Sequence, residues 1–480
     1  MAEGVAPGAA PARPSVSGAG PIYDVAVVGG GVVGCAVARE LAGYDLSVAL
    51  IEARGDVGDV TSKANTAIWH TGFDAGPGTL EARLVARGWQ LLGDYAEATG
   101  IPLERTGAVL VAWNDDELAA LPGLEAKARE NGYERAELLT AEEVYARLPS
   151  LGGGVLGGLS VPDEGIICPW STTLALALDA QARGAAMLLG AEVSGVDVGA
   201  DRTTLTTAAG PVEARWVVGA AGLGADHLDR AFGHARFTVT PRRGELIVYD
   251  KLARAHVDRV VLPVPTARGK GVLVSPTVYG NVMVGPTSED LTDRRETATS
   301  EAGLAGLRER ARRLLPALEG EEITAVYAGL RAATEHSDYV VEVDEAQRYL
   351  CLGGIRSTGL TSSMALGEHV AGLLAEAGLA LTPREGLPAP PAMPPIGEAQ
   401  RRPYADDERL AADPAYGRII CFCERVSQGE IRDALASPLP PRDLAGLRRR
   451  TRATMGRCQA FYCGAEVAAL LAEATTGGER

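Results

Sequence analysis

Cysteine is scarce in this sequence: only seven occur among its 480 residues. So few thiols exclude the disulfide-dense scaffold of small secreted domains, and a reducing cytoplasm would keep ordinary thiols free. Long apolar runs are also missing, since no stretch approaches the eighteen consecutive apolar residues that a membrane-spanning helix needs. We therefore expect a cytoplasmic protein, peripheral to a membrane only through a partner.

Basic residues are outnumbered: 46 Lys and Arg stand against 62 Asp and Glu, which gives a formal net charge of −16. Such a charge repels nucleic-acid phosphates, so nucleic acid is not an expected partner. The first twenty residues lack the basic start and the apolar core of a secretory signal, and their small residues and prolines predict a disordered leader. The remainder is long enough for two or three domains.

The segment YDVAVVGGGVVGCAVARELAGYDLSVALIEA predicts a strand, a glycine turn, a helix and a second strand in succession. Gly29, Gly31 and Gly34 have the GxGxxG spacing, and Glu52 ends the second strand. These glycines permit a tight turn, the approach of backbone amides to a diphosphate, and close packing of helix on strand. Glu52 can accept hydrogen bonds from the ribose of an adenosine. The segment therefore predicts a dinucleotide site.

The rest of the chain suggests further units. Alternating Val, Leu and polar residues separated by Gly and Pro predict an antiparallel sheet, and the dense prolines after Leu381 predict a semi-rigid linker. The expected fold class is α/β. Its expected parts are a disordered leader (1–20), a discontinuous Rossmann-like domain (21–95, 160–240 and 325–380), an inserted antiparallel-sheet substrate domain (96–159 and 241–324), the linker (381–413) and a small helical module (414–475).

Four of the seven cysteines are grouped near the end of the chain, as CxC at Cys421 and Cys423 and as CxxxxC at Cys458 and Cys463. Grouped cysteines in a reducing compartment are typical of metal ligands. Four thiolates can hold an iron–sulfur cluster or a structural zinc ion, and free thiols are a third alternative. A single residue between the first two ligands is unusual among the common zinc spacings.

An arginine run precedes the second cysteine pair. These side chains could offset the negative charge of a cluster, form a docking patch for an acidic partner, or make an ordinary solvated face. The run consists of Arg448, Arg449, Arg450, Arg452 and Arg457.

The segments CFCERVSQGEIRDAL and TRATMGRCQAFYC resemble the bacterioferritin-associated-ferredoxin-like 2Fe-2S module at the C-terminus of the anaerobic glycerol-3-phosphate dehydrogenase family. The resemblance implies that all four grouped cysteines hold a 2Fe-2S cluster. Nicotinamide transfers electrons in pairs, whereas such a cluster takes them singly. Since a flavin can do both, FAD is the expected dinucleotide.

Residues 22 to about 380 are similar to the FAD-dependent oxidoreductases of the D-amino-acid-oxidase and glycerol-3-phosphate dehydrogenase superfamily, in segments such as TSKANTAIWHTGFDAGPG, PRRGELIVYD and GGIRSTGLTSS. The resemblance implies oxidation of a C–H bond beside oxygen or nitrogen. Beyond the glycine motif and Glu52, the residues expected to contact the cofactor are Ser62, Lys63, Asn65, Thr66, Gly222, Gly354, Arg356, Gly359, Leu360 and Thr361.

Three residues are candidates for catalysis. His70, in a Trp-His context, could accept the hydroxyl proton, be attached to the flavin, or simply be packed. His336 is an alternative base. Arg331 resembles the superfamily arginine that grips an anionic substrate, because a guanidinium forms two parallel hydrogen bonds with carboxylate or phosphate.

We expect a dehydrogenase of a small anionic alcohol, with glycerol 3-phosphate favoured. Relatives specific for that substrate often carry a Lys where this chain reads GIRSTGLTSS, so an L-2-hydroxy acid such as L-2-hydroxyglutarate stays open, as does an amino or imino acid. A non-catalytic electron-transfer or scaffold subunit is the alternative from another class. The expected partners are an electron acceptor protein or a quinone-linked subunit, possibly in a hetero-oligomer.

Overall fold

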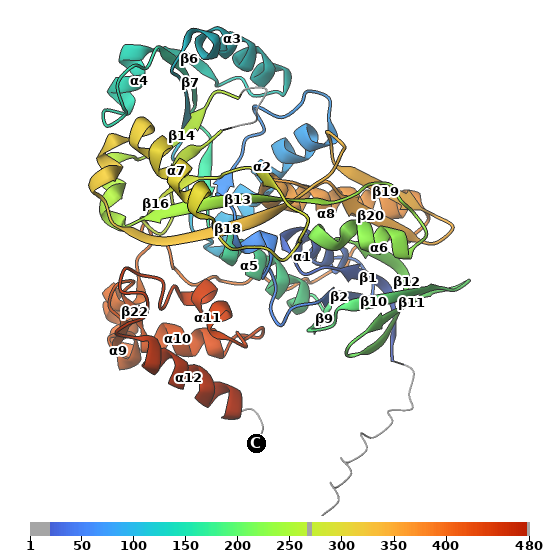
Figure 1. The fold of residues 1–480 in the computed structure, drawn as a ribbon. Helices are drawn as coiled ribbons and strands as arrows, with labels where there is room; N and C mark the ends of the chain where they lie inside the picture. Colours follow the sequence, from blue (N-terminus) through green and yellow to red (C-terminus); the bar gives the residue numbers. More distant parts are fainter. Residues whose placement is uncertain (1–19, 266–270, 478–480) are drawn as a thin grey trace, which may run out of the picture.

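The computed structural model describes residues 20–265 and 271–477. The predicted leader, residues 1–20, lies outside this part of the chain except for its last residue. Figure 1 shows a large body made of sheets and helices, with a smaller C-terminal module, drawn in red, at one end of it. Within the described ranges, no helix is long and apolar enough to cross a bilayer.

A sheet of eight strands carries the glycine motif. Its spatial order is β10-β11-β12-β1-β2-β9, and β20 pairs with both β12 and β19. The central strands are parallel, and the apolar run of β2 is buried along its whole length, as expected where helices cover both faces. The strands are β1 (Ile22–Val28), β2 (Val48–Glu52), β9 (Ala186–Leu189), β10 (Val193–Val198), β11 (Thr203–Thr207), β12 (Gly210–Gly219), β19 (Val340–Asp344) and β20 (Tyr349–Gly353).

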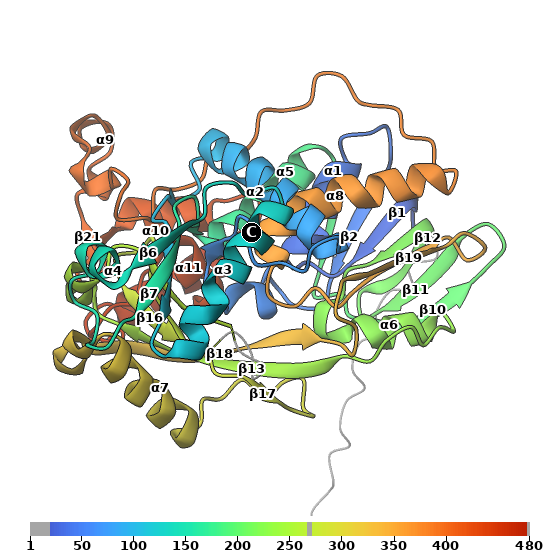
Figure 2. The same cartoon turned by 90° about the horizontal axis from the view of Figure 1, so that it is seen from above.

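Helices from distant parts of the sequence cover this sheet. α1, which follows the glycine motif, packs against α5 and α8, and α8 packs against α2. Figure 2 shows these four helices grouped on one side of β1 and β2. A fifth helix, α6, contacts β20 and β12. The bounds are α1 (Val32–Leu41), α2 (Leu80–Thr99), α5 (Pro169–Ala182), α6 (Ala225–Ala231) and α8 (Gly359–Glu376).

A second sheet of nine strands is mostly antiparallel, with order β17-β13-β16-β15-β14-β5-β7-β6, and β18 pairs with β13. Three helices accompany it: α3 (Asp115–Glu130), α4 (Ala141–Arg147) and α7 (Glu301–Leu314). The strands are β5 (Ala108–Ala112), β6 (Glu137–Thr140), β7 (Gly157–Val161), β13 (Thr240–Tyr249), β14 (Val260–Pro263), β15 (Leu273–Pro276), β16 (Val282–Gly285), β17 (Glu289–Asp290) and β18 (Ile323–Ala333).

Small elements connect the two sheets. A three-stranded sheet has the order β3-β8-β4, with β3 (Ile68–Trp69), β8 (Gly165–Ile167) and β4 (Leu103–Glu104). Short 3-10 turns lie at η1 (Thr61–Lys63), η2 (Gly222–Gly224), η3 (Lys251–His256) and η4 (Pro316–Gly320).

The proline-rich segment 381–413, expected to be a linker, lies against the large body for part of its length. Met393 and Ile396 are 8% and 2% exposed and belong to the main core. Met393 N–H donates to the carbonyl oxygen of Thr99, at the end of α2. The segment continues into η5 (Pro403–Ala405), α9 (Asp407–Ala412) and η6 (Pro414–Tyr416).

The C-terminal module has a small core of its own, formed by Ile420, Val426, Ile431, Leu447 and Val467 together with two cysteines. Its elements are β21 (Ile419–Cys421), β22 (Val426–Ser427), α10 (Gln428–Leu435), α11 (Leu444–Thr451) and α12 (Gly464–Gly477). The predicted α/β class, with an antiparallel second sheet and a helical C-terminal module, is confirmed.

Candidate functional site

A cavity of about 2010 Å³ opens between the two sheets. Most of the residues that the sequence assigned to cofactor and substrate line its wall, although they come from distant segments. Those that line it are Gly29, Gly31, Glu52, Ser62, Asn65, Thr66, His70, Gly222, Arg331, Gly354, Arg356, Gly359 and Leu360. Those that do not are Gly34, Lys63, His336 and Thr361.

The glycine motif forms the end of the cavity next to α1. Gly29 has a φ of +116°, and a Cβ there would lie 2.3 Å from the carbonyl oxygen of Ala220. A Cβ at Gly34 would lie 1.8 Å from the carbonyl oxygen of Gly29. Gly34 is therefore needed for helix–strand packing rather than for contact with a ligand. The bare backbone leaves the cradle for a diphosphate at the N-terminus of α1.

Glu52 is held rigidly at the end of β2. Gly30 N–H donates to its Oε2 at 2.6 Å, and Arg54 N–H donates to its Oε1 at 2.7 Å. Burial raises the pKa of this carboxyl, while the two N–H donors oppose the rise. A carboxylate fixed at this position, beside the glycine cradle, suits the ribose of an adenosine.

The segment 61–66 passes along the cavity wall, held by its own hydrogen bonds. Val32 N–H donates to Ser62 Oγ at 3.0 Å, which ties the segment to the start of α1. The Asn65 amide donates to the Ser62 carbonyl at 2.9 Å and accepts from Ala67 N–H at 2.8 Å. Lys63 differs from its expected role, because its ammonium pairs with Asp59 at 2.9 Å and does not line the cavity.

His70 is paired with a carboxylate that the sequence reasoning missed. Its Nδ1 lies 3.0 Å from Oε2 of Glu164, whose side chain is fully buried. The other oxygen of Glu164 accepts hydrogen bonds from the N–H of Thr71 at 2.7 Å and from its hydroxyl at 2.9 Å. Thr361, although outside the cavity wall, accepts a hydrogen bond from His70 N–H at 3.1 Å.

Only strand pairing brings Glu164 to the histidine. Trp69 in β3 is paired with Gly165 in β8, so the residues beside them, His70 and Glu164, become neighbours across 94 positions of sequence. Glu164 is one of two adjacent acids in the run VPDEGIIC, and nothing in their spacing could reveal this pairing.

Arg331 provides a half-buried positive charge in the cavity. It lies on β18, and its guanidinium donates to the carbonyl oxygen of Thr287 at 2.9 Å. Burial lowers the pKa of Arg331, followed by the neighbouring charge of Arg242. Among the described residues, no carboxylate forms an ion pair with Arg331, whereas Arg242, which lies opposite it on β13, pairs with Asp290 at 2.5 Å. The Arg331 charge therefore remains available to an anionic ligand.

Two further candidates differ from Arg331. Arg356 lines the cavity but donates to Glu81 Oε2 at 3.1 Å and to the Ser337 carbonyl at 2.6 Å, so its charge is already paired. His336, the alternative base, has a side chain 46% exposed, and its Nε2 lies 3.0 Å from the Arg236 carbonyl. The structure places it outside the cavity, because β18 ends before it and the chain turns to the surface.

The four grouped cysteines meet in the C-terminal module. Burial and, after it, the neighbouring thiol of Cys458 raise the pKa of Cys423, and burial and the neighbouring thiol of Cys421 raise that of Cys463, so each of these pairs lies close together. No set of three or more His, Cys, Asp or Glu side chains in the described ranges is arranged to hold a single metal ion. Two pairs of thiols instead match the needs of a two-iron cluster, in which each iron takes two protein ligands.

Backbone donors surround one of these sulfurs. N–H groups of residues 460–462, led by that of Tyr462, lower the pKa of the Cys458 thiol, whereas burial raises that of Cys463 to about 12. Gln459 and Ala460 have φ values of +51° and +69°, so the chain between the ligands turns back on itself. Hydrogen bonds from the backbone to sulfur are one means of tuning an iron–sulfur cluster. The donor set therefore fits the predicted group.

The arginine run has another role than the solvated face or docking patch considered from sequence. Arg449 and Arg450, both on α11, form ion pairs with Asp56 of the large body at 2.6 and 2.8 Å. The side chains of Arg449, Arg450 and Arg452 are only 9%, 4% and 5% exposed. Most of the arginine run thus binds the C-terminal module to the large body. Arg457, 47% exposed, pairs with Asp250.

Two family models match this chain. Residues 24–373 match a family described as FAD dependent oxidoreductase, and residues 419–473 match the BFD-like [2Fe-2S] binding domain. The predicted FAD and 2Fe-2S cofactors are confirmed by these matches. The second match favours the cluster over zinc and over free thiols.

Individual relatives extend the comparison. A glycerol 3-phosphate dehydrogenase of Caloramator mitchellensis is 36% identical over 456 residues, covering 94% of each chain. An L-2-hydroxyglutarate dehydrogenase of Escherichia coli (strain K12) is 32% identical over 56% of this chain and 64% of its own. The solved structure of dithionite-reduced L-alpha-glycerophosphate oxidase from Mycoplasma pneumoniae, with FAD bound, has a TM-score of 0.73 at 28% identity, covering 78% of this chain and 99% of that one.

Proposed function

Because this chain belongs to the FAD-dependent oxidoreductase family, we propose that it is a glycerol 3-phosphate dehydrogenase that passes electrons through its 2Fe-2S module to an external acceptor. The observation that carries the proposal is one cavity wall that holds both Arg331, which pairs with no carboxylate of the described residues, and His70, which Glu164 supports from behind the wall. The similarity to the Caloramator dehydrogenase along nearly the whole chain supports the choice of substrate.

Binding of the substrate falls to Arg331. A half-buried guanidinium without a carboxylate partner is stabilised by a bound anion, and its planar fork suits phosphate or carboxylate oxygens. Arg242, held by Asp290, adds positive potential at the same wall. The anion would orient the substrate and exclude water from its binding position.

Deprotonation of the substrate hydroxyl falls to His70. The Glu164 carboxylate can only accept, so Nδ1 of His70 must donate to it. This fixes the tautomer in which Nε2 is the acceptor for the hydroxyl proton. When bound, FAD supplies the acceptor for the electron pair, and the cluster takes electrons singly.

Release of electrons is proposed at the exposed edge of the module. Phe422 lies between the first two ligands, and Phe461 and Tyr462 lie between the last two, with 71%, 83% and 74% of their surfaces exposed. An acceptor protein or quinone-linked subunit that approached here would come close to the cluster. Aromatic side chains of this kind are enriched where proteins associate.

Anaerobic titration of the purified holoprotein tests the substrate. We expect glycerol 3-phosphate to bleach the flavin absorbance at stoichiometric amounts, and L-2-hydroxyglutarate or glycine to leave it unchanged. An Arg331→Met variant should need a large excess of substrate, because the anion would lose its fork of donors. Bleaching by L-2-hydroxyglutarate alone would reassign the substrate, and bleaching by none of the three would contradict the proposal.

A further inference from the structure

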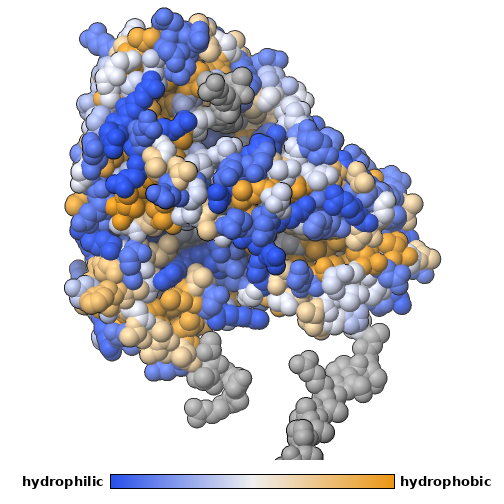
Figure 3. All heavy atoms as spheres, viewed as in Figure 1, coloured by the Kyte–Doolittle hydropathy of each residue, from blue (hydrophilic) through white to orange (hydrophobic). Residues whose placement is uncertain are grey.

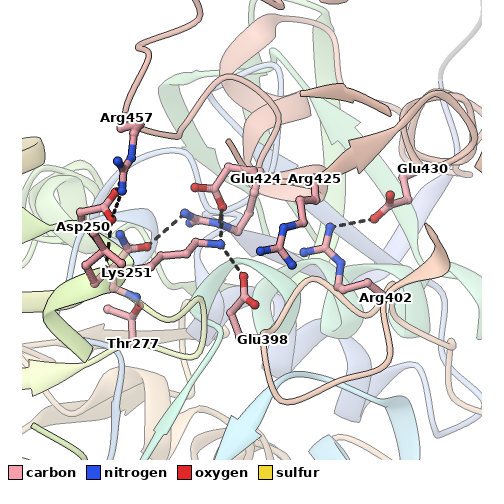
Figure 4. Close-up of polar contacts among 12 residues, drawn as sticks. Asp250, Lys251, Thr277, Glu398, Arg402, Glu424, Arg425, Glu430 and Arg457 are labelled. Carbon is pink, nitrogen blue, oxygen red and sulfur yellow. Dashed lines mark hydrogen bonds and ion pairs between the residues drawn. The ribbon is translucent and has the colours of Figure 1, made fainter. Parts of the chain in front are cut away.

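The cluster-binding loop continues into a buried polar seam between the module and the large body (Figure 4). Glu424 follows the ligand Cys423 directly and is 3% exposed. Its carboxylate lies 2.9 Å from Nε of Arg452 and 3.2 Å from Nζ of Lys251. Lys251 also pairs with Glu398, at the more exposed end of the seam.

The charge pair lies close to the ligand. A Cβ at Gly456 would lie 2.2 Å from Cβ of Cys423 and 3.3 Å from Oε1 of Glu424, so the loop at Gly456 packs directly against the ligand and its neighbour. Arg452 itself ends α11 with a φ of +67° and is 4% exposed. Solvent therefore screens these charges little.

Aromatic side chains of the large body hold Arg452 in place. Its guanidinium carbon lies 4.2 Å from the ring centroid of Tyr279 and 5.9 Å from that of Trp170, and the two rings are stacked 5.0 Å apart. The Trp170 indole N–H donates to the Lys63 carbonyl at 3.0 Å, within the segment that passes the cavity. A chain of contacts thus runs from the cluster-binding loop, through the Glu424–Arg452 pair, to the segment 61–66 on the cavity wall.

We propose that the buried pair of Glu424 and Arg452 sets the reduction potential of the 2Fe-2S cluster. Reduction adds one electron to the cluster and makes or breaks no bond; the electron comes from substrate-reduced FAD and leaves to the external acceptor. A fixed positive charge nearby favours the reduced state, and a fixed negative charge favours the oxidised state. The two side chains therefore act in opposite directions on one equilibrium.

Redox titration of the full-length holoprotein, followed by the EPR signal of the reduced cluster, tests this inference. Glu424→Gln should raise the midpoint potential, and Arg452→Met should lower it. Each shift should correspond to about a tenfold change in the equilibrium constant for reduction, which is about 59 mV for one electron. Arg452→Lys, which keeps the charge, should lie close to the wild type. Iron and flavin content are measured on every sample.

A matched control is available in the same seam. Arg402 and Glu430 form a pair of similar burial, 2.9 Å apart with side chains 5% and 6% exposed, without contact to the Cys423 loop (Figure 4). Arg402→Met should leave the potential unchanged. The proposal would be overturned if Glu424→Gln and Arg452→Met shifted the potential in the same direction, or if the control shifted it equally, because either result would indicate a general loosening of the interface. It would also be overturned if neither variant shifted the potential. If Arg452→Met loses the cluster, Glu424→Gln and Arg452→Lys decide the question.

The inference does not depend on which substrate reduces the flavin. A dithionite or mediator titration reports on the cluster even if glycerol 3-phosphate leaves the flavin oxidised, so failure of the two proposals is distinguishable.

Discussion

At the scale of single residues, the tautomer proposed for His70 depends on one buried carboxylate. The Glu164 carboxylate makes three hydrogen bonds inside the protein, two of them with Thr71 and one with His70. A buried acceptor with that many donors is fixed in position and orientation. The chemistry assigned to His70 therefore rests on a residue that lines no part of the cavity.

Glu164→Gln tests that dependence. The amide can present an N–H to Nδ1 of His70, which would favour the opposite tautomer and remove Nε2 as an acceptor. We expect the rate of flavin reduction in stopped-flow experiments to fall on the order of 100-fold, while the substrate KM changes little. Thr71→Val, which removes one hydrogen bond but keeps the carboxylate, serves as the control. A loss of less than threefold in Glu164→Gln would show that the carboxylate does not set the tautomer.

At the scale of elements, the cavity depends on close backbone approaches between segments distant in sequence. A Cβ at Gly329 of β18 would lie 2.0 Å from the carbonyl oxygen of Ala64, in the segment 61–66 on the cavity wall. Tyr327 O–H donates to the Asn65 carbonyl at 2.8 Å, and Thr61 O–H donates to the Leu330 carbonyl at 2.9 Å. The segment 61–66 is thus joined directly to β18, the strand that carries Arg331.

Gly329→Ala should separate these two elements. The added methyl group has no room against backbone, and overpacking of this kind costs about 1–3 kcal/mol. We expect weaker retention of FAD, measured as flavin fluorescence released on dilution, together with a lower melting temperature. Gly320→Ala, where nothing lies within 4 Å of the added methyl, should retain flavin like the wild type. Equal retention in both variants would contradict the assigned packing.

At the scale of the whole molecule, ion pairs fasten the C-terminal module to the loop that follows Glu52. Asp56 receives hydrogen bonds from Arg449 and Arg450, and Gly58, in the same loop, donates to the Gly30 carbonyl of the glycine motif. The C-terminal module is therefore attached to the part of the large body that contains the glycine motif and Glu52, where we propose that the adenosine end of the cofactor binds.

Asp56→Asn should weaken this attachment. Removing one partner leaves buried guanidinium groups uncompensated, at a cost of about 3–5 kcal/mol. Although burial opposes it, Arg450 and Arg449 hold the pKa of Asp56 below its ordinary value. Because that pKa is depressed on folding, the stabilisation is present above about pH 4 and is lost as the pH falls through the folded-state pKa.

The measurement is thermal unfolding of the holoprotein between pH 7 and pH 3. The wild type should lose stability towards the acid end, and the Asn variant should begin lower at pH 7 and lose less. Arg457→Gln, which breaks a half-exposed pair with Asp250, is the control and should cost about 0–1 kcal/mol. Parallel curves for Asp56→Asn and the wild type would mean that this carboxylate does not carry the acid sensitivity.

The amino-acid sequence by itself determined the α/β class and the two cofactors, and it predicts the glycine cradle and the four cysteine ligands, because each depends on local spacing: a glycine turn between strand and helix, or cysteines grouped near the end of the chain. Only the tertiary structure decided the partner of His70, the position of His336 outside the cavity, and the use of the arginine run as an interface. These features depend on strand register and domain packing, which join residues far apart in the chain, and no local pattern records such contacts.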